Sequence, residues 1–134
     1  IVVIMALQYK LNARLEEIDY DANIRRQRLN IGNMLIDRTT GLGAGNTMTA
    51  DDDPAGTAIP IGQVTSPGLS LFENHDADNN LEILFDDGSA LQLIAEIPPG
   101  KFIVTWLAST ITDYFARAQN SPVSFTYYIG QREP

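Results

Sequence analysis

Oxygen-bearing side chains gather in one short segment of the chain, residues 75–82. Four of them stand at alternate positions, as the oxygen ligands of a calcium-binding loop do: Asp76, Asp78, Asn80 and Glu82. However, Leu81 occupies the position where such a loop needs a glycine for its sharp turn, and the flanking residues alternate as strands do, not as helices. Because Asn and Asp side chains also stabilise tight turns, we predict a turn here and no metal site.

The run Gly41-Leu42-Gly43-Ala44-Gly45 resembles a phosphate-binding loop only in its glycines. A P-loop continues into Lys and then Ser or Thr, which bind the phosphates and Mg²⁺, and it connects a buried strand to a helix. This chain lacks the Lys-Ser/Thr pair, and no strand leads through the run into a helix. The run therefore predicts a flexible loop.

Catalytic groups of other kinds are scarce. The chain has no cysteine and one histidine, His75, which excludes a Cys/His zinc site and leaves no neighbouring nucleophile for a His-based relay. A surface histidine in a turn is the expectation. Four aromatic residues could form a platform on which a sugar ring stacks: Trp106, Tyr114, Tyr127 and Tyr128. Alternation places most of them in the core or on a sheet face, and core packing is favoured. We expect no catalytic residue, no cofactor and no metal ion.

The charge is distributed unevenly along a chain of 134 residues whose composition is that of an ordinary globular domain. Residues 1–40 hold six basic and five acidic residues, a net charge of +1. Residues 41–134 hold three basic and twelve acidic residues, a net charge of −9, and the whole chain has a net charge of −8. An acidic surface repels phosphate backbones, so no nucleic acid partner is expected. The basic residues Arg25, Arg26 and Arg28 could bind an acidic partner, although a solvated face is favoured.

The first residues are apolar: Ile1, Val2, Val3 and Ile4 lead into Met5-Ala6-Leu7. This stretch is too short for a membrane span and lacks the basic residues that begin a secretion signal, so we expect neither. An exposed apolar edge strand would promote aggregation. The stretch therefore either forms a strand buried on both faces or docks against a neighbouring subunit, and the second alternative is preferred.

Alternation of apolar and polar residues predicts two strands near the N-terminus, over residues 7–15 and 29–35. Gly32 is a candidate bulge in the second strand. The residues between the strands, 21–28, could form a helical turn that Asp21 caps, or a loop. The first forty residues therefore continue the pattern of strands.

Residues 39–58 have a different composition, with four glycines, a proline and three successive aspartates. Such a segment predicts a long loop or an extended arm, and long ordered loops tend to lie on a partner. Residues 59–64 then predict an edge strand, because Pro60 cannot donate a hydrogen bond to a neighbouring strand.

From residue 69 onward short apolar segments are separated by turn signals, including Asp86-Asp87-Gly88 and Pro98-Pro99-Gly100. This pattern predicts an all-β fold, an antiparallel β-sandwich or jelly-roll-like barrel with a long glycine-rich loop or arm. We expect a single sandwich domain over residues 1–134. It comprises N-terminal strands in residues 1–38, the arm in 39–58 and the main sandwich strands in 59–134.

The second half of the chain carries a resemblance to a known group of proteins. Residues 71–83, Leu-Phe-Glu-Asn-His-Asp-Ala-Asp-Asn-Asn-Leu-Glu-Ile, resemble the "strand, N-x-D-x-x-N, hydrophobic-E-hydrophobic" hairpin of small virion proteins of tailed bacteriophages. Pro98-Pro99-Gly100, the strand Tyr114-Phe115-Ala116-Arg117-Ala118 and a closing strand over residues 123–130 follow in the same order. The resemblance covers about half of the chain and departs from the family at Ser109-Thr110, where a second Pro-Gly turn is common.

The resemblance implies a structural virion protein without enzymatic activity, most simply a capsid decoration (cement) protein that binds and stabilises the shell. It would assemble in the bacterial cytoplasm and bind other virion proteins, above all the major capsid protein, as a homo-oligomer, with a trimer favoured. The alternatives are a tail, neck or fibre-attachment subunit, or a carbohydrate-binding β-sandwich module. Partner contacts are predicted at the apolar start, the basic residues and the glycine-rich run: Ile1, Val2, Val3, Ile4, Arg25, Arg26, Arg28, Gly41, Gly43 and Gly45.

Overall fold

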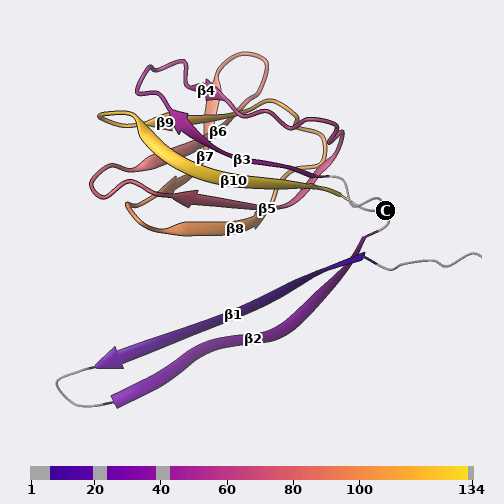
Figure 1. The fold of residues 1–134 in the computed structure, drawn as a ribbon, viewed down its shortest axis with the longest axis vertical. Coiled ribbons are helices and arrows are strands. Elements are labelled where there is room, and N and C mark those ends of the chain that lie inside the picture. Colours follow the sequence, from indigo (N-terminus) through magenta and orange to yellow (C-terminus); the bar gives the residue numbers. More distant parts are fainter. Residues whose placement is uncertain (1–6, 20–23, 39–42, 133–134) are drawn as a thin grey trace, which may run out of the picture. The chain divides into compact units, whose positions relative to one another are not determined.

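The computed structural model describes residues 7–19, 24–38 and 43–132, and all of the regular secondary structure in these ranges is β-strand. The chain divides into two compact units, residues 1–40 and residues 41–132 (Figure 1). The sequence predicted one domain and did not separate the first unit from the second. In the described ranges there is no helix that could cross a membrane.

The first unit is an antiparallel hairpin of two long strands, β1 (Leu7–Asp19) and β2 (Ile24–Arg38). Both strands that the sequence predicted in this region are confirmed, and each is longer than predicted. A register shift leaves one extra residue on β2 next to Gly32, where the sequence predicted a bulge. Residues 24–28 belong to β2, so neither the helical turn nor the loop forms there; residues 20–23 lie outside the described residues.

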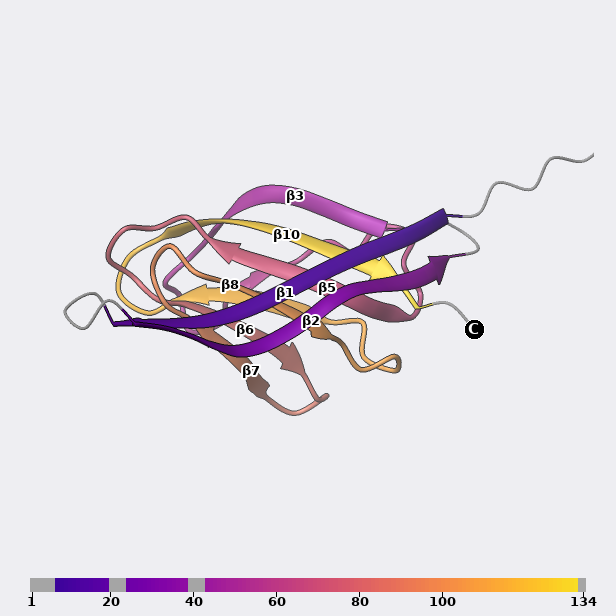
Figure 2. The ribbon, with the colours of Figure 1, turned by 90° about the horizontal axis from the view of Figure 1, so that it is seen from below.

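The second unit is a β-sandwich of two antiparallel four-stranded sheets (Figures 1 and 2). The first sheet has the order β3-β10-β5-β8, with β3 (Gly43–Ala50), β10 (Val123–Gln131), β5 (Pro67–Asn74) and β8 (Phe102–Trp106). The second has the order β4-β9-β6-β7, with β4 (Thr57–Ala58), β9 (Tyr114–Ala118), β6 (Leu81–Asp86) and β7 (Leu91–Ile97). The predicted all-β sandwich is therefore confirmed.

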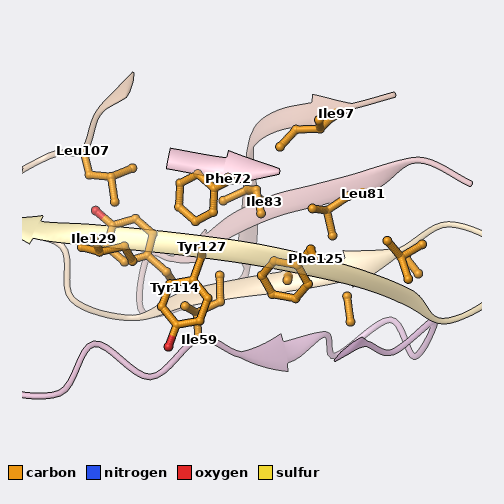
Figure 3. Packing of buried hydrophobic residues seen from close by; sticks show 14 of the residues in the cluster. Ile59, Phe72, Leu81, Ile83, Ile97, Leu107, Tyr114, Phe125, Tyr127 and Ile129 are labelled. Atoms are coloured by element: carbon orange, nitrogen blue, oxygen red, sulfur yellow. The ribbon is translucent and has the colours of Figure 1, made fainter. Parts of the chain in front are cut away.

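The core lies between the two sheets and is built from alternate residues of their strands (Figure 3). Phe72 and Phe125 contribute from the first sheet, and Leu81 and Ile83 contribute from the second; all four are fully buried. Each buried side chain of this size stabilises the fold by about 1.5–3 kcal/mol relative to an exposed one. The alternation that predicted these strands therefore also identifies the faces that meet.

Two tyrosines belong to this core, as their positions in the sequence predicted. Tyr114 and Tyr127 are buried, and burial raises the pKa of both phenols. Each hydroxyl nevertheless has an acceptor: Tyr127 donates to the carbonyl of Pro60 at 2.8 Å, and Tyr114 donates to that of Ala108 at 3.3 Å. The phenols therefore anchor loops to the sandwich while their rings fill the core.

The segment predicted as a loop or arm contains a strand. Residues 43–50 form β3 and pair with β10 along their whole length, so the predicted arm is wrong for this part of residues 39–58. Glycine permits this pairing, because a Cβ at Gly45 would lie only 3.2 Å from the ring of Tyr128. Residues 51–56 form a turn in which Gly56 donates to the carbonyl of Asp53 at 2.9 Å, and residues 39–42 lie outside the described residues.

The edge strand predicted over residues 59–64 is also wrong. The strand at this edge is β4, which ends at Ala58. The following residues form a turn in which Val64 donates to the carbonyl of Ile61 at 3.0 Å and Gly62 has a φ of +57°. Ile59 and Val64 are buried, so the apolar pattern of this segment reflects side chains that enter the core from a loop.

Candidate functional site

The outer face of the β3-β10-β5-β8 sheet is the candidate functional site. Register places one row of residues across all four strands, in which Val104 pairs with Leu71, Leu71 with Tyr128, and Tyr128 with Gly45. Neighbouring rows pair Trp106 with Leu69, and Phe102 with Glu73. Cross-strand partners share a face, so Gly45 and Thr47 of β3 belong to this outer face together with eight residues of the other three strands. These eight are Leu69, Leu71, Glu73, Phe102, Val104, Trp106, Thr126 and Tyr128.

Strand β8 exposes most of the apolar surface of this outer face. Phe102 is 63% exposed, Trp106 is 50% exposed and Val104 is 37% exposed. Single exposed apolar residues are common, but three large ones at alternate positions of one strand form an apolar patch. The residues between them, Ile103 and Thr105, are partly buried and pair with the inward-facing residues of β5.

The position of Trp106 corrects the sequence prediction. Its core placement is wrong, because β8 is apolar on both faces and alternation alone does not tell the inner face from the outer one. The guanidinium carbon of Arg132 lies 5.4 Å from the centroid of the Trp106 ring, a cation–π contact. Arg132 is itself fixed, since its Nε donates to the carbonyl of Pro67 at 3.2 Å and its Nη2 to that of Leu107. The indole therefore has a supported orientation at the surface.

A polar border adjoins the apolar residues. A hydrogen bond of 2.7 Å joins His75 Nε2 to Thr126 Oγ1, and Thr126 Oγ1 lies 2.8 Å from Thr47 Oγ1. His75 Nδ1 lies 3.9 Å from Glu73 Oε1, and both side chains are substantially exposed. The predicted surface position of His75 is confirmed. The outer face therefore has an apolar part on β8 and β5 beside a hydrogen-bonded polar part.

The oxygen-rich segment between β5 and β6 forms the tight turn that the sequence predicted. Asp76 Oδ1 accepts hydrogen bonds from the backbone N–H of Asp78 at 2.7 Å and of Asn79 at 2.8 Å, and these bonds lower the pKa of Asp76. Asn74 Oδ1 accepts from the N–H of Asp76 at 2.8 Å. These polar side chains therefore bind the backbone of their own turn.

The opposite sheet presents a different outer face. Its outer row includes an ion pair of 3.0 Å between Arg117 and Glu82, and this pair raises the pKa of Arg117. Arg117 Nη1 also donates to the carbonyl of Pro54 at 3.0 Å. Glu96 accepts from Asn80 at 2.7 Å, so much of this outer face is occupied by paired polar groups. Strand β7 of this sheet also exposes Leu93 and Ile94, whereas β8 exposes three large apolar side chains on one face of a strand.

The partner-contact residues predicted from the sequence are only partly within the described ranges. Gly43 and Gly45 lie in β3, beside Tyr128. Arg25, Arg26 and Arg28 lie in β2, in the other unit. Ile1, Val2, Val3, Ile4 and Gly41 lie outside the described residues. The structure does not test these contacts, and they stay predictions.

Sequence reasoning missed Phe102 and Val104, and it assigned Trp106 to the core. The signal that could have found them is the apolar character of both faces of residues 102–107, in a short strand that follows the Pro-Pro-Gly turn. If a strand is apolar on both faces, one face packs in the core, and the other face is buried only when a second apolar surface covers it.

The described residues bring together no group of three or more His, Asp or Glu side chains that could hold a metal ion. No family model matches the chain. No curated protein and no solved structure matches it either. The chemistry that the outer face itself offers is apolar contact area, an oriented indole and a border of hydrogen-bonding groups.

Proposed function

We propose that this protein is a structural subunit that binds another protein through the outer face of its β3-β10-β5-β8 sheet. The observation that supports this function is the exposure of Phe102, Val104 and Trp106 on one rigid strand. Aromatic residues and arginine are enriched where protein surfaces bind, and oriented aromatic side chains are frequent anchors. Trp106 with Arg132 stacked on it is such an anchor.

The rigid sandwich favours this role. Its outer-face residues belong to hydrogen-bonded strands, so binding would order few additional groups and would lose little conformational entropy. The polar border, with Glu73 and His75, would form the rim that surrounds an apolar interface. Residues 41–134 carry a balance of −9, so the complementary partner surface would be apolar with a basic surround.

We further propose that the partner is a virion protein and that the chain is a capsid decoration (cement) protein of a tailed bacteriophage. The resemblance of residues 71–130 to small phage virion proteins supports this assignment, and an exposed apolar face suits a subunit that joins parts of a particle. The role is non-enzymatic, the major capsid protein is the expected partner and the virion is the expected location. A tail, neck or fibre-attachment subunit would use the same face on a different part of the particle.

The test is reconstitution on particles that lack the protein. Added protein should co-sediment with the shells and raise their melting temperature, because ligand binding stabilises the form that it binds. Trp106→Ala and Phe102→Ala should each weaken binding by about tenfold or more. Leu93→Ala, which removes a side chain 53% exposed on the opposite sheet, is the matched control and should bind as the unmodified protein does.

Two outcomes of this experiment separate the alternatives. Protein that co-sediments with isolated tails but not with shells would indicate the tail or neck role. Protein that binds neither, and leaves the melting temperature of the shells unchanged, would contradict a virion role.

A carbohydrate-binding module is the second candidate, and the exposed ring of Trp106 is the observation that favours it. Sugar rings stack on aromatic side chains that a flat β-sheet presents to solvent. Saturable glycan binding that Trp106→Ala abolishes and Leu93→Ala retains would establish this function. A glycan array without signal, measured on the same protein that binds shells, would exclude it.

A further inference from the structure

The free edge of strand β8 is the feature that carries a further inference. Within the described residues of the second unit, β8 lies at the end of the β3-β10-β5-β8 sheet and pairs with β5 on one side only. Asn74 donates to the carbonyl of Lys101 at 2.9 Å, and Leu107 donates to the carbonyl of Gly68 at 3.0 Å, so residues 101 and 107 direct their backbone groups toward β5.

Alternation then fixes the direction of every other backbone group of β8. In an antiparallel strand, the N–H and C=O of one residue point to the same side, and the next residue points to the opposite side. Ile103 and Thr105 therefore bond to β5, as residues 101 and 107 do. The N–H and C=O groups of Phe102, Val104 and Trp106 point away from β5, to the open edge. These are the same residues whose side chains are exposed.

Two of the other three edges of the sandwich have a feature that limits pairing with another strand. β4 is only two residues long. β7 has a register shift that leaves one extra residue, and it carries the charge of Glu96. β3 has neither a charged residue nor a register shift, but its glycines and small polar side chains offer a pairing strand little apolar contact. β8 has no register shift, no proline and no charged residue, so it lacks the devices by which edge strands avoid pairing.

We propose that β8 pairs with β8 of a second copy of this chain, antiparallel and about a two-fold axis at Val104. In this register Val104 lies opposite Val104 of the second copy, and Phe102 lies opposite Trp106 of the second copy. Each copy contributes three outward N–H groups and three outward C=O groups, so all of them are satisfied together in a two-fold pairing. The strand is therefore complementary to itself.

The same register matches the side chains. Cross-strand partners share a face, so the pairing places two aromatic pairs and one valine pair on one continuous surface. The β3-β10-β5-β8 sheets of the two copies then join into one sheet of eight strands, and the outer face of one copy lies beside the outer face of the other. The pairing is independent of what binds to the outer face, and it doubles the surface available to that partner.

The decisive experiment is a cross-link at the two-fold axis in the full chain. The protein has no cysteine, so Val104→Cys introduces a single thiol. Cα atoms of a hydrogen-bonded antiparallel pair lie about 5.5 Å apart, which is within the range that a disulfide spans. Under mild oxidation Val104→Cys should yield a covalent dimer at dilute concentration. Thr49→Cys, on the opposite edge strand β3, is the matched control and should stay monomeric.

A second measurement tests the equilibrium without a covalent bond. Sedimentation velocity of the unmodified protein should show a concentration-dependent dimer. Val104→Lys places like charges opposite each other at the axis and should weaken dimerisation by at least about 100-fold, whereas Thr49→Lys should not change it. Circular dichroism of each variant confirms that the sandwich is folded.

Two results would overturn the proposal: a Val104→Cys protein that does not cross-link faster than Thr49→Cys, or an oligomer whose stability Val104→Lys leaves unchanged. A trimer, which the sequence resemblance favours, would also contradict a pairing that is closed by a two-fold axis. Because these measurements need no shells or glycans, their failure leaves the proposed binding function to its own test.

Discussion

Asn74 is a buried amide that holds together the turn between β5 and β6. It is 1% exposed, its Nδ2 donates to the carbonyls of Asn79 at 2.8 Å and Ile97 at 3.0 Å, and its Oδ1 accepts from the N–H of Asp76. Loss of this side chain leaves buried backbone groups without partners. Asn74, which directly precedes the oxygen-rich segment 75–82, is therefore important for the structure of the turn.

We predict that Asn74→Ala lowers the free energy of unfolding by about 1–3 kcal/mol, because buried polar groups lose their hydrogen bonds. Urea denaturation followed by tryptophan fluorescence measures this change. Asn120→Ala, at an exposed position, is the control and should change the free energy by less than about 0.5 kcal/mol. Equal stability of the two variants would contradict the role of Asn74.

Asp76 makes the stability of this turn depend on pH. Its pKa lies below the ordinary value of 3.8 because backbone N–H groups bind the carboxylate. Its stabilising contribution is therefore complete above the unfolded pKa and is lost as the pH falls through the lowered folded pKa. We predict that Asp76→Asn makes the urea midpoint fall less steeply as the pH decreases from about 5 to about 2.

The control for this titration is Asp52→Asn. The Asp52 side chain is exposed and accepts no hydrogen bond within the described ranges, so Asp52→Asn controls for the loss of one surface carboxylate. If Asp76→Asn shows the same steep fall as the unmodified protein, the carboxylate of Asp76 is not the source of the dependence.

At the scale of elements, the connection between β7 and β8 determines where the exposed strand begins. Lys101 donates to the carbonyl of Pro98 at 3.1 Å, and Gly100 has a φ of +70°. Proline followed by glycine suits the two central positions of a type II turn, since the second requires a positive φ. This turn is one of the signals from which the sequence predicted strands on either side.

We predict that Gly100→Ala destabilises the protein by about 1–2 kcal/mol, the cost of a left-handed conformation for a residue with a Cβ. A Cβ at this position would meet nothing within 4 Å, so the loss comes from the backbone and not from a clash. Gly100→Asn should cost less, because asparagine tolerates this conformation better. Thermal unfolding of the two variants measures the difference, and an unchanged midpoint for Gly100→Ala would refute the argument.

The strands of the second unit show how far local patterns predict structure. Residues 81–86, 91–97 and 114–118 were predictable because turn residues bound them and their inner residues alternate. Residues 43–50 were not, since their glycines indicate a loop unless one knows that β10 supplies a partner strand. The exposure of Trp106 was equally hidden, because it depends on which face of β8 the pairing with β5 turns away from the core. Long-range pairing decided both cases.

At the scale of the whole molecule, the two units differ in their means of stabilisation. The second unit has a closed core between two sheets, whereas the first is a two-stranded sheet. Isolated two-stranded hairpins are marginally stable in water, but a sandwich of eight strands can fold by itself. The second unit can therefore fold alone, whereas the hydrogen bonds between β1 and β2 are not sufficient to make the hairpin stable in water.

We predict that a fragment of residues 41–132 folds and unfolds cooperatively, and that a peptide of residues 1–40 does not form a stable hairpin alone. Dispersion of amide resonances and far-UV circular dichroism measure both outcomes. The full chain under the same conditions is the reference. A disordered fragment 41–132 would contradict the division into units, and a stable isolated hairpin would contradict the argument from sheet size.

The close packing of β3 against β10 limits which residues can replace the glycines of β3. A Cβ at Gly43 would overlap the hydroxyl of Tyr128, whereas a Cβ at Gly45 would lie 3.0 Å from the carbonyl oxygen of Tyr127. A smaller residue at position 128 would relieve the first clash but not the second. Divergent copies of this gene should therefore accept a side chain at position 43 where the Tyr128 side chain moves or is replaced, whereas a side chain at position 45 also requires the β10 backbone to shift and should be rarer.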